Sequence, residues 1–391
     1  MKILNKLNEE LVRDLSNQKN ELNFILDKRL NALKEFNKLS MPNFRYGLNI
    51  RLNYDFDLDN LEINDAQKIN LNKNKKIIFS RFEDLKDNEI LKEYFMKLIN
   101  NENKFLALNS AFFSNGILIY VPKDTRLKKP LTLSVLQNSN TLIKHLLIVL
   151  DENSELNFID DFSSDNKEKS YSGKIVEIFV KENAKLNYIN LQNLSLFTYN
   201  FNFKKVKLYS NSTLNLYDLN FGSKLTYSDT IVDLDGENSR FEHYGAFVSN
   251  ETQQFDLGLS AVHNKPYTYS NMLTKGALND NSKAIYRGLI KINKDAHNSN
   301  GYQKEETVLF SNRAESDSIP KLEIDNNDVR CTHGTSISQL DEDKLFYLMS
   351  RGLDEKEAKM ELVKGFFDDI LRKVNLKNMK KIYEIIHDKI K

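Results

Sequence analysis

Residues 182–188, ENAKLNY, decide the fold, because close copies of this stretch return along the chain at a nearly constant interval. The copies are ENSELNF at 152–158, NSTLNL at 211–216 and ENSRFEH at 237–243. Each places asparagine and a small residue ahead of alternating apolar positions, which is the pattern of a tight turn leading into a β-strand. The equivalent apolar residues are Leu156, Leu186, Leu214 and Phe241, so the interval is 30, 28 and 27 residues.

An interval of this length, with short strands and polar turns, is typical of a solenoid whose coils stack and bury their inward side chains. The alternation of apolar and polar residues begins near residue 105, and Ile117, Ile119 and Val121 are its first clear example. We therefore predict a mainly β protein with a right-handed parallel β-helix as its core. A β-sandwich built from similar hairpins is the alternative that the pattern leaves open.

Helical patterns flank this core on both sides. Two helices are predicted near the N-terminus. Asn8 is the candidate N-cap of the first. The second has an apolar stripe over residues 22–36 and ends before Met41-Pro42. Between residues 43 and 104 only a helix over Glu89–Ile99 can be predicted. After the core, Asp341 is the candidate cap of a helix over 342–351. We expect a helical and mixed region over 1–104, the β-helix core over 105–340 and a helical region over 341–391.

The C-terminal region carries two further signals of helix ends. Gly352 follows the helix over 342–351 as a C-terminal glycine, and DEKE at 354–357 has the form of a capping box. An apolar stripe from Ala358 to Leu371 and a last helix around Ile382 and Ile386 follow. These helices must bury their apolar faces against each other, the last coil or a partner.

Composition excludes several classes of function. The formal charge of +1 offers no basic surplus for nucleic acid or for an anionic membrane surface. No stretch approaches 18 apolar residues, so we expect no membrane span. One cysteine cannot form an internal disulfide, which favours a reducing, cytoplasmic compartment. Neither a G-x-x-x-x-G-K-[ST] nor a G-x-G-x-x-G motif is present, so any ATP-driven step needs a separate subunit.

The only cysteine, Cys331, stands two residues before His333 in DVRCTHG, residues 328–334. If this stretch is a strand, both side chains point to the same face, about 6–7 Å apart along the strand. A thiolate beside an imidazole is ligand chemistry for iron, iron–sulfur species or zinc. Two ligands do not complete such a site, so we expect the others from another subunit, another loop or the cargo. The alternative is a cysteine that serves only as a small buried apolar residue.

Several stretches, taken together with their order and mutual distances, resemble the SufB/SufD family, the β-helical scaffold subunits of the SUF iron–sulfur cluster assembly system. They are KGAL (275–278), YRGLI (286–290), GYQ (301–303), IPKLEI (319–324), DVRCTHG (328–334), LFYL (345–348) and SRG (350–352). The Cys-x-His-Gly form looks like SufD, whereas residues 19–21 and 286–289 look more like SufB. The resemblance is strongest over 265–371 and favours a SufD-like chain, with one protein serving both roles as the alternative.

The resemblance implies a scaffold, not an enzyme, on which a nascent iron–sulfur cluster forms transiently. It implies a SufC-type ATPase bound at the C-terminal helices, and a SufB-type paralogue or a second copy as dimer partner. It also implies that Cys331 and His333 handle sulfur or ligate iron, and that Lys275 could hold anionic sulfur species in transit. Some complexes of the family bind reduced flavin, for which the sequence indicates no site.

Other candidates receive weaker support. His263 matches a recurrent family histidine, but a structural role is at least as plausible, and His243 has no such match.

A β-solenoid enzyme acting on polysaccharide is the rival class of function. The neighbouring carboxylates Asp160 and Asp161 would point to opposite faces of a strand and make a poor acid–base pair. A purely structural SufD-type subunit, in which Cys331 is inert, is the remaining alternative.

Overall fold

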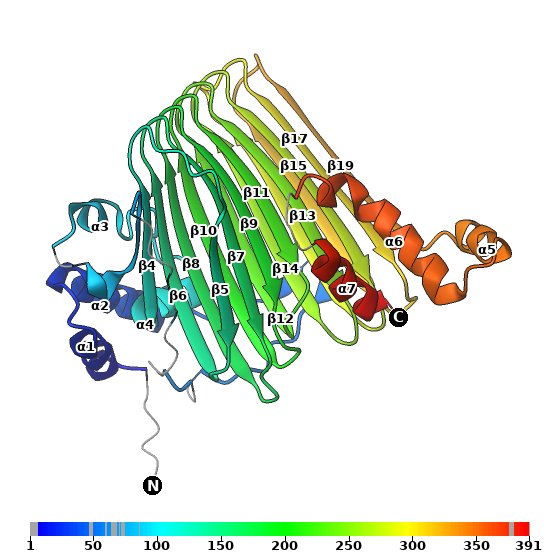
Figure 1. Cartoon of the computed structure of the whole chain (residues 1–391), viewed down its shortest axis with the longest axis horizontal. Helices are drawn as coiled ribbons and strands as arrows, with labels where there is room; N and C mark the ends of the chain where they lie inside the picture. Colours follow the sequence, from blue (N-terminus) through cyan, green and yellow to red (C-terminus); the bar gives the residue numbers. More distant parts are fainter. Residues whose placement is uncertain are drawn as a thin grey trace, which may run out of the picture.

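The body of the protein is a stack of β-strands that progresses along one axis, with helices packed against it near both ends of the chain (Figure 1). The computed structural model describes residues 7–46, 50–58, 61–63, 69, 71, 75–85, 87–374 and 379–390. No helix in these ranges is long and apolar enough to cross a membrane.

Two sheets form the walls of the stack, and consecutive strands alternate between them. Within the described ranges one sheet has the order β18-β16-β14-β12-β10-β8-β6-β4-β3 and the other β19-β17-β15-β13-β11-β9-β7-β5. The neighbours are parallel, except that β3 (Ile78–Arg81) runs antiparallel to β4 (Asn115–Val121). A parallel β-solenoid is therefore confirmed, and the β-sandwich alternative is wrong.

The remaining strands are short and of similar length. They are β5 (Leu131–Gln137), β6 (Thr141–Leu150), β7 (Glu155–Ser164), β8 (Ser170–Val180), β9 (Lys185–Asn193), β10 (Thr198–Leu208), β11 (Thr213–Asn220), β12 (Leu225–Leu234), β13 (Arg240–Ser249), β14 (Gln254–His263), β15 (Tyr269–Leu278), β16 (Lys283–Ile292), β17 (Asn300–Leu309), β18 (Glu315–Ile324) and β19 (Arg330–Gln339). The pair β1 (Arg45–Tyr46) and β2 (Ile50–Arg51) forms a separate antiparallel ribbon.

The repeat sets the register of the coils. Leu156 pairs with Leu186, Leu186 with Leu214, and Leu214 with Phe241, so the four equivalent residues form one inward column. All four are fully buried, and burial of each such side chain contributes roughly 1.5–3 kcal/mol. The asparagines that precede them adopt the left-handed conformation, as Asn183 does with φ of 57°, which asparagine tolerates better than most residues. The predicted turns are therefore confirmed.

The N-terminal helices cover the outer face of the nine-stranded sheet (Figure 1). These are α1 (Glu9–Gln18), α2 (Asn23–Lys38), α3 (Glu89–Tyr94) and α4 (Lys104–Phe112), with a short 3₁₀ turn at Phe82–Asp84. Asn8 caps α1 through its side chain, as predicted. Phe105 of α4 stacks on Phe201 of β10, with ring centroids 3.7 Å apart. The N-terminal region is thus built onto the solenoid wall.

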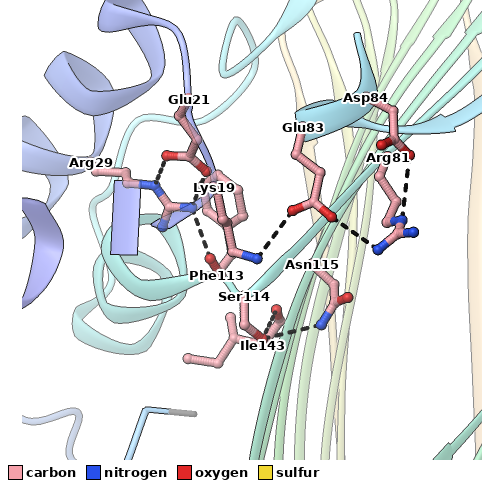
Figure 2. Close-up of polar contacts among 10 residues, drawn as sticks. All are labelled: Lys19, Glu21, Arg29, Arg81, Glu83, Asp84, Phe113, Ser114, Asn115 and Ile143. Carbon is pink, nitrogen blue, oxygen red and sulfur yellow. Dashed lines mark hydrogen bonds and ion pairs between the residues drawn. The ribbon is translucent and has the colours of Figure 1, made fainter. Parts of the chain in front are cut away.

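A buried ion pair joins α2 to the residues that precede it and to the end of α4 (Figure 2). Arg29 of α2 lies 2.6 Å from the Glu21 carboxylate, with both side chains almost completely buried. Its guanidinium also donates to the backbone oxygens of Ala111 and Phe113, each at 2.9 Å. Lys19 and Arg81 both reach Glu83, at 3.3 and 2.9 Å. The buried Arg29 guanidinium thus has both an ion-pair partner and backbone acceptors, as a buried charge requires.

The predicted helix over Glu89–Ile99 is too long, because α3 ends at Tyr94. Met96 has a positive φ of 49°. The backbone N–H groups of Met96 and Leu98 donate to the carboxylate of Glu177, at 2.8 and 2.9 Å. A longer helix would use these two N–H groups in its own backbone hydrogen bonds, but here the carboxylate on the sheet accepts them. No local sequence pattern encodes this tertiary contact.

The C-terminal helices are α5 (Glu342–Ser350), α6 (Glu355–Leu371) and α7 (Met379–Ile390). Asp341 caps α5, and the predicted capping box between Asp354 and Glu357 is present at the start of α6. The apolar stripes of α6 and α7 pack on the outer face of the eight-stranded sheet, against residues such as Leu219 and Val248. By contrast, α5 buries no residue and extends away from the stack (Figure 1).

Candidate functional site

Cys331 and His333 lie on β19, the last strand of the eight-stranded sheet. The predicted strand is therefore confirmed, and its alternation puts both residues on the face that looks into the solenoid. Cys331 packs against the interior apolar cluster and is partly buried, whereas His333 is exposed. The two side chains thus differ in environment although they share one face.

The position of β19 explains this exposure. β18 and β19 end the two sheets, and no further strand of the described ranges stacks on them. Their inward face is therefore an open end of the solenoid, where a side chain that would be core in an earlier coil can meet solvent or another molecule. Cys331 and His333 lie at that end.

Burial raises the pKa of the Cys331 thiol to about 11. The thiol is therefore protonated at neutral pH and is not a ready nucleophile. Ligation of a metal or acceptance of sulfur requires loss of this proton, and an incoming cation would favour that loss. Within the described ranges, no group of three or more His, Cys, Asp or Glu side chains is placed to hold a metal ion. The chain presents two candidate ligands, not a complete site.

Two polar residues of the preceding coil, which were not predicted, lie beneath β19 close to this pair. In the register of β17 and β19, Gln303 pairs with His333 and Glu305 with Thr335. Both side chains face inward and are about 1% exposed. Among the residues that the structure describes, Gln303 Oε1 and Glu305 Oε2 have no hydrogen-bond partner. A buried oxygen without a partner costs free energy, so these two atoms would gain from an additional donor such as water.

Glu305 has an unusual titration. Burial raises the pKa of its carboxyl to about 7, although the hydrogen bond from the Thr307 hydroxyl acts in the opposite direction. The carboxyl group therefore changes charge near neutral pH. The only signal in the sequence is strand alternation, which turns Glu305 inward and its neighbour Glu306 outward.

A polar lane of buried polar and charged side chains runs through the interior from the first coils towards this end. Its members are Lys144, Asp160, Lys174, Asn190, Lys204, Asp218 and His243. Lys174 contacts Asp160 at 2.7 Å, and Lys204 contacts Asp218 at 2.9 Å. Burial alone would raise the pKa of Asp160, but the ammonium groups of Lys144 and Lys174 hold it well below its usual range. The lane was not predicted.

The two other histidines considered from the sequence have structural surroundings. His243 belongs to the polar lane and lies 3.6 Å from Asp218. His263 is buried, and its ring nitrogens contact the hydroxyls of Thr268 and Ser270, each at 2.8 Å. Burial lowers the pKa of His263 to about 4, so it is neutral at physiological pH. The structural role is the one that this geometry supports for His263.

Lys275 is not brought to Cys331 and His333. It lies on the outward face of β15, under α6, where Nζ donates to the backbone oxygen of Phe366 at 2.8 Å. The same ammonium group lies 2.9 Å from Asp369 and 3.4 Å from Glu306. The wall of the solenoid therefore separates Lys275 from the inward pair. Its contacts are those of a residue that holds the C-terminal helices on the sheet, and they give no support to sulfur handling.

Comparison with known proteins agrees with this architecture. Residues 134–366 match the family model for the SufBD core domain of SUF system FeS cluster assembly, and residues 58–133 match that for the SufBD N-terminal region. The chain belongs to the SufBD family. A SufBD family iron–sulfur cluster assembly protein of Staphylococcus saprophyticus is 30% identical, with 94% of this chain and 90% of the relative covered. One from Staphylococcus aureus is 31% identical over the same shares.

The expected family is thus confirmed, and the chain is a SufBD protein of iron–sulfur cluster assembly. The two family models together span residues 58–366, which include β19 with Cys331 and His333. Membership in a family of cluster assembly removes the ground for the polysaccharide enzyme, which rested only on the solenoid shape.

Proposed function

We propose that this SufBD protein is a SufD-like scaffold subunit on which sulfur and iron are brought together, and that it acts as a scaffold and not as an enzyme. The nascent cluster is its cargo. The observation that carries the proposal is the placement of Cys331 and His333 on the inward face of the last coil, at the open end of the solenoid. A thiol and an imidazole on one face supply soft and borderline ligands for iron.

The remaining ligands come, in this proposal, from a second SufBD chain stacked on the open end. β18 and β19 present strand edges whose backbone groups no further strand of the described ranges pairs, and such edges favour pairing with another chain. Ile319, Ile324 and Ile337 on these strands are each about 40% exposed. The partner is a SufB-type paralogue or a second copy, and its own end coil would complete the site.

A SufC-type ATPase is the proposed partner of the C-terminal helices. Phe346, Tyr347 and Met349 of α5 are exposed by 73%, 56% and 41%. A groove of about 660 Å³ with an apolar lining lies between α6 and the end of β17 and β19. An exposed apolar helix beside such a groove supports a protein partner here. ATP-driven movement of that partner would open the scaffold end, and we place the complex in the cytoplasm.

A purely structural role for Cys331 is the second candidate, because the raised thiol pKa and the packing against the interior are what inert packing would show. Reduced flavin remains a cofactor suggested by family resemblance alone.

Anaerobic reconstitution with iron and sulfide, with and without a SufC-type partner, distinguishes the two candidates. We expect charge-transfer absorbance in the wild-type protein, and its loss in Cys331→Ser and in His333→Ala with unchanged circular dichroism. His297→Ala, at an exposed histidine outside the site, is the matched control and should retain the absorbance. Equal absorbance in all four proteins would leave Cys331 as a packing residue and refute the ligand role.

A further inference from the structure

The outer face of the eight-stranded sheet carries a groove that the proposed scaffold role does not use. It has a volume of about 420 Å³ and lies over β7, β9 and β11, with Lys373 after the end of α6 forming part of its lining. Figure 1 shows this part of the sheet beside α7 and without a helix in front of it. The volume lies within the range of small-molecule sites, roughly 300–1,000 Å³.

Three stacked asparagines run across the groove. Asn157, Asn187 and Asn215 occupy equivalent positions in neighbouring strands. The amide nitrogen of Asn187 donates to Asn157 Oδ1 at 2.6 Å, and that of Asn215 donates to Asn187 Oδ1 at 2.7 Å. The three side chains therefore form a continuous ladder whose amides face the groove.

The asparagine ladder offers a ligand both donors and acceptors. An asparagine amide has two N–H donors and an oxygen that can accept two hydrogen bonds. The ladder uses one donor of Asn187, one donor of Asn215 and one acceptor site on each of the oxygens of Asn157 and Asn187. Donors and acceptor sites therefore remain in equal number, and turning all three amides over would not change this balance.

Lysines add positive charge on the same groove. Lys128, Lys185 and Lys373 line it, and no Asp or Glu is among the lining residues. Lys373 is held in place, because its Nζ donates to the Tyr244 hydroxyl at 2.7 Å and lies 4.1 Å from the centre of that ring. Glu155 pairs with Lys185 in the register of β7 and β9 and is the flanking carboxylate on this face. The preference of the groove for an anionic ligand therefore comes from its lysines, and the amide N–H groups of the ladder add donors.

The floor of the groove is apolar. Ile159, Ile189 and Tyr217 line it. Tyr217 is stacked on Tyr244 with ring centroids 5.4 Å apart and an angle of 23° between the rings, so its plane is fixed. A ligand that satisfies all these features needs an anionic group rich in oxygen and a flat, less polar body. Ammonium groups and amide donors suit phosphate oxygens.

We propose that this groove binds a phosphate-bearing small molecule with an aromatic ring system, of about mononucleotide size. The phosphate lies against the lysines and the asparagine donors, and the ring lies over Ile189 and Tyr217. The proposal is independent of the cluster site, because the groove is on the outward face and Cys331 is on the inward face. Free nucleotides and nucleotide-like cofactors share this chemistry, and the probes below separate them.

Calorimetric titration of the full chain with matched ligand pairs tests the proposal. The pairs are AMP with adenosine, and FMN with riboflavin, and inorganic phosphate is titrated alone. We expect saturable binding of at least one phosphorylated probe, and at least about tenfold weaker binding of the same ring without phosphate, because the charged contacts are lost. A preference for AMP or for FMN identifies the source. No saturable binding of any phosphorylated probe up to about 5 mM overturns the proposal.

Variants locate the binding. Lys185→Glu should weaken it by at least about tenfold, and Asn187→Leu, which removes the central amide, by several fold. Lys129→Glu makes the same charge change at an exposed lysine that does not line the groove, and its affinity should stay within about twofold of wild type. Circular dichroism and thermal unfolding confirm that the variants fold. An equal loss of affinity in Lys185→Glu and Lys129→Glu would show general charge attraction and refute a specific binding site in the groove.

Discussion

The sulfur of Cys331 lies 3.5 Å from the point where a side chain at Gly301 would place its Cβ. The two residues pair in the register of β17 and β19, so the absence of a side chain in one coil makes room for the thiol of the next. The same point is 2.9 Å from Ile290 Cγ2, which leaves no free space for a larger residue. The glycine therefore controls how deeply Cys331 sits in the end of the solenoid.

Gly301→Val should push the Cys331 thiol outwards and lower the free energy of unfolding by about 1–3 kcal/mol, the usual cost of overpacking. We expect a faster reaction of the thiol with a disulfide reagent at pH 8. Gly334→Ala is the control, because nothing lies within 4 Å of its added Cβ, and its reaction rate should match wild type. A slower reaction in Gly301→Val would contradict this account of the thiol's depth.

The alkylation rate of Cys331 should rise about tenfold per pH unit from pH 7 to 10 without levelling off, because only the thiolate reacts. Burial raises the pKa of this thiol to about 11, whereas an ordinary thiol levels off near about 8.5. The same protein unfolded in urea serves as the reference and should level off in the ordinary range. A plateau of the folded protein near pH 8 would show an unburied or activated thiol.

Glu305 should make the protein less stable as pH rises from about 4.5 to 7. Burial raises the pKa of its carboxyl from 4.5 to about 7, so in this window the folded state holds a proton that the unfolded state has lost. The stabilisation from this group is present below pH 4.5 and is lost as pH rises through 7. Glu305→Gln keeps the shape of the protonated form and removes the titration.

Urea unfolding at pH 5 and pH 8 measures this effect. The change in unfolding free energy between the two pH values should differ between wild type and Glu305→Gln by about 2 kcal/mol, with the variant relatively more stable at pH 8. Glu306→Gln, at the outward neighbour, should follow the wild-type pH dependence. Parallel curves for wild type and Glu305→Gln would mean that the carboxyl ionises in its ordinary range.

Lys275→Met should loosen α6 without affecting the cluster site. The lysine joins β15 to the Phe366 backbone oxygen and to Asp369 of α6, and loss of these contacts should cost about 1–3 kcal/mol. We expect faster hydrogen exchange over residues 355–371 and unchanged absorbance after reconstitution with iron and sulfide. Lys304→Met, at a more exposed lysine of the neighbouring strand, is the control. Loss of absorbance with normal exchange would instead restore a role in sulfur handling.

The sequence could predict what depends on local periodicity. Leu156, Leu186, Leu214 and Phe241 indicated the solenoid and identified the residues that pair between its coils, since stacked coils repeat equivalent residues at nearly equal intervals. The caps Asn8, Asp341 and Asp354 were also predictable, because a side chain three residues from its donor is a local contact. Strand alternation placed Cys331 and His333 on one face for the same reason.

Contacts between distant segments were decided only by the tertiary structure. Glu177 ends α3 from a strand some 80 residues away, and Lys275 lies beneath α6. Over residues 43–104 neither period holds for long, so only one helix was predicted there. The partners of Glu305, and hence its raised pKa, follow from which coils stack above and below it. Periodicity along the chain says which way a side chain points, but burial, charge pairing and an open end depend on what packs against that side chain in space.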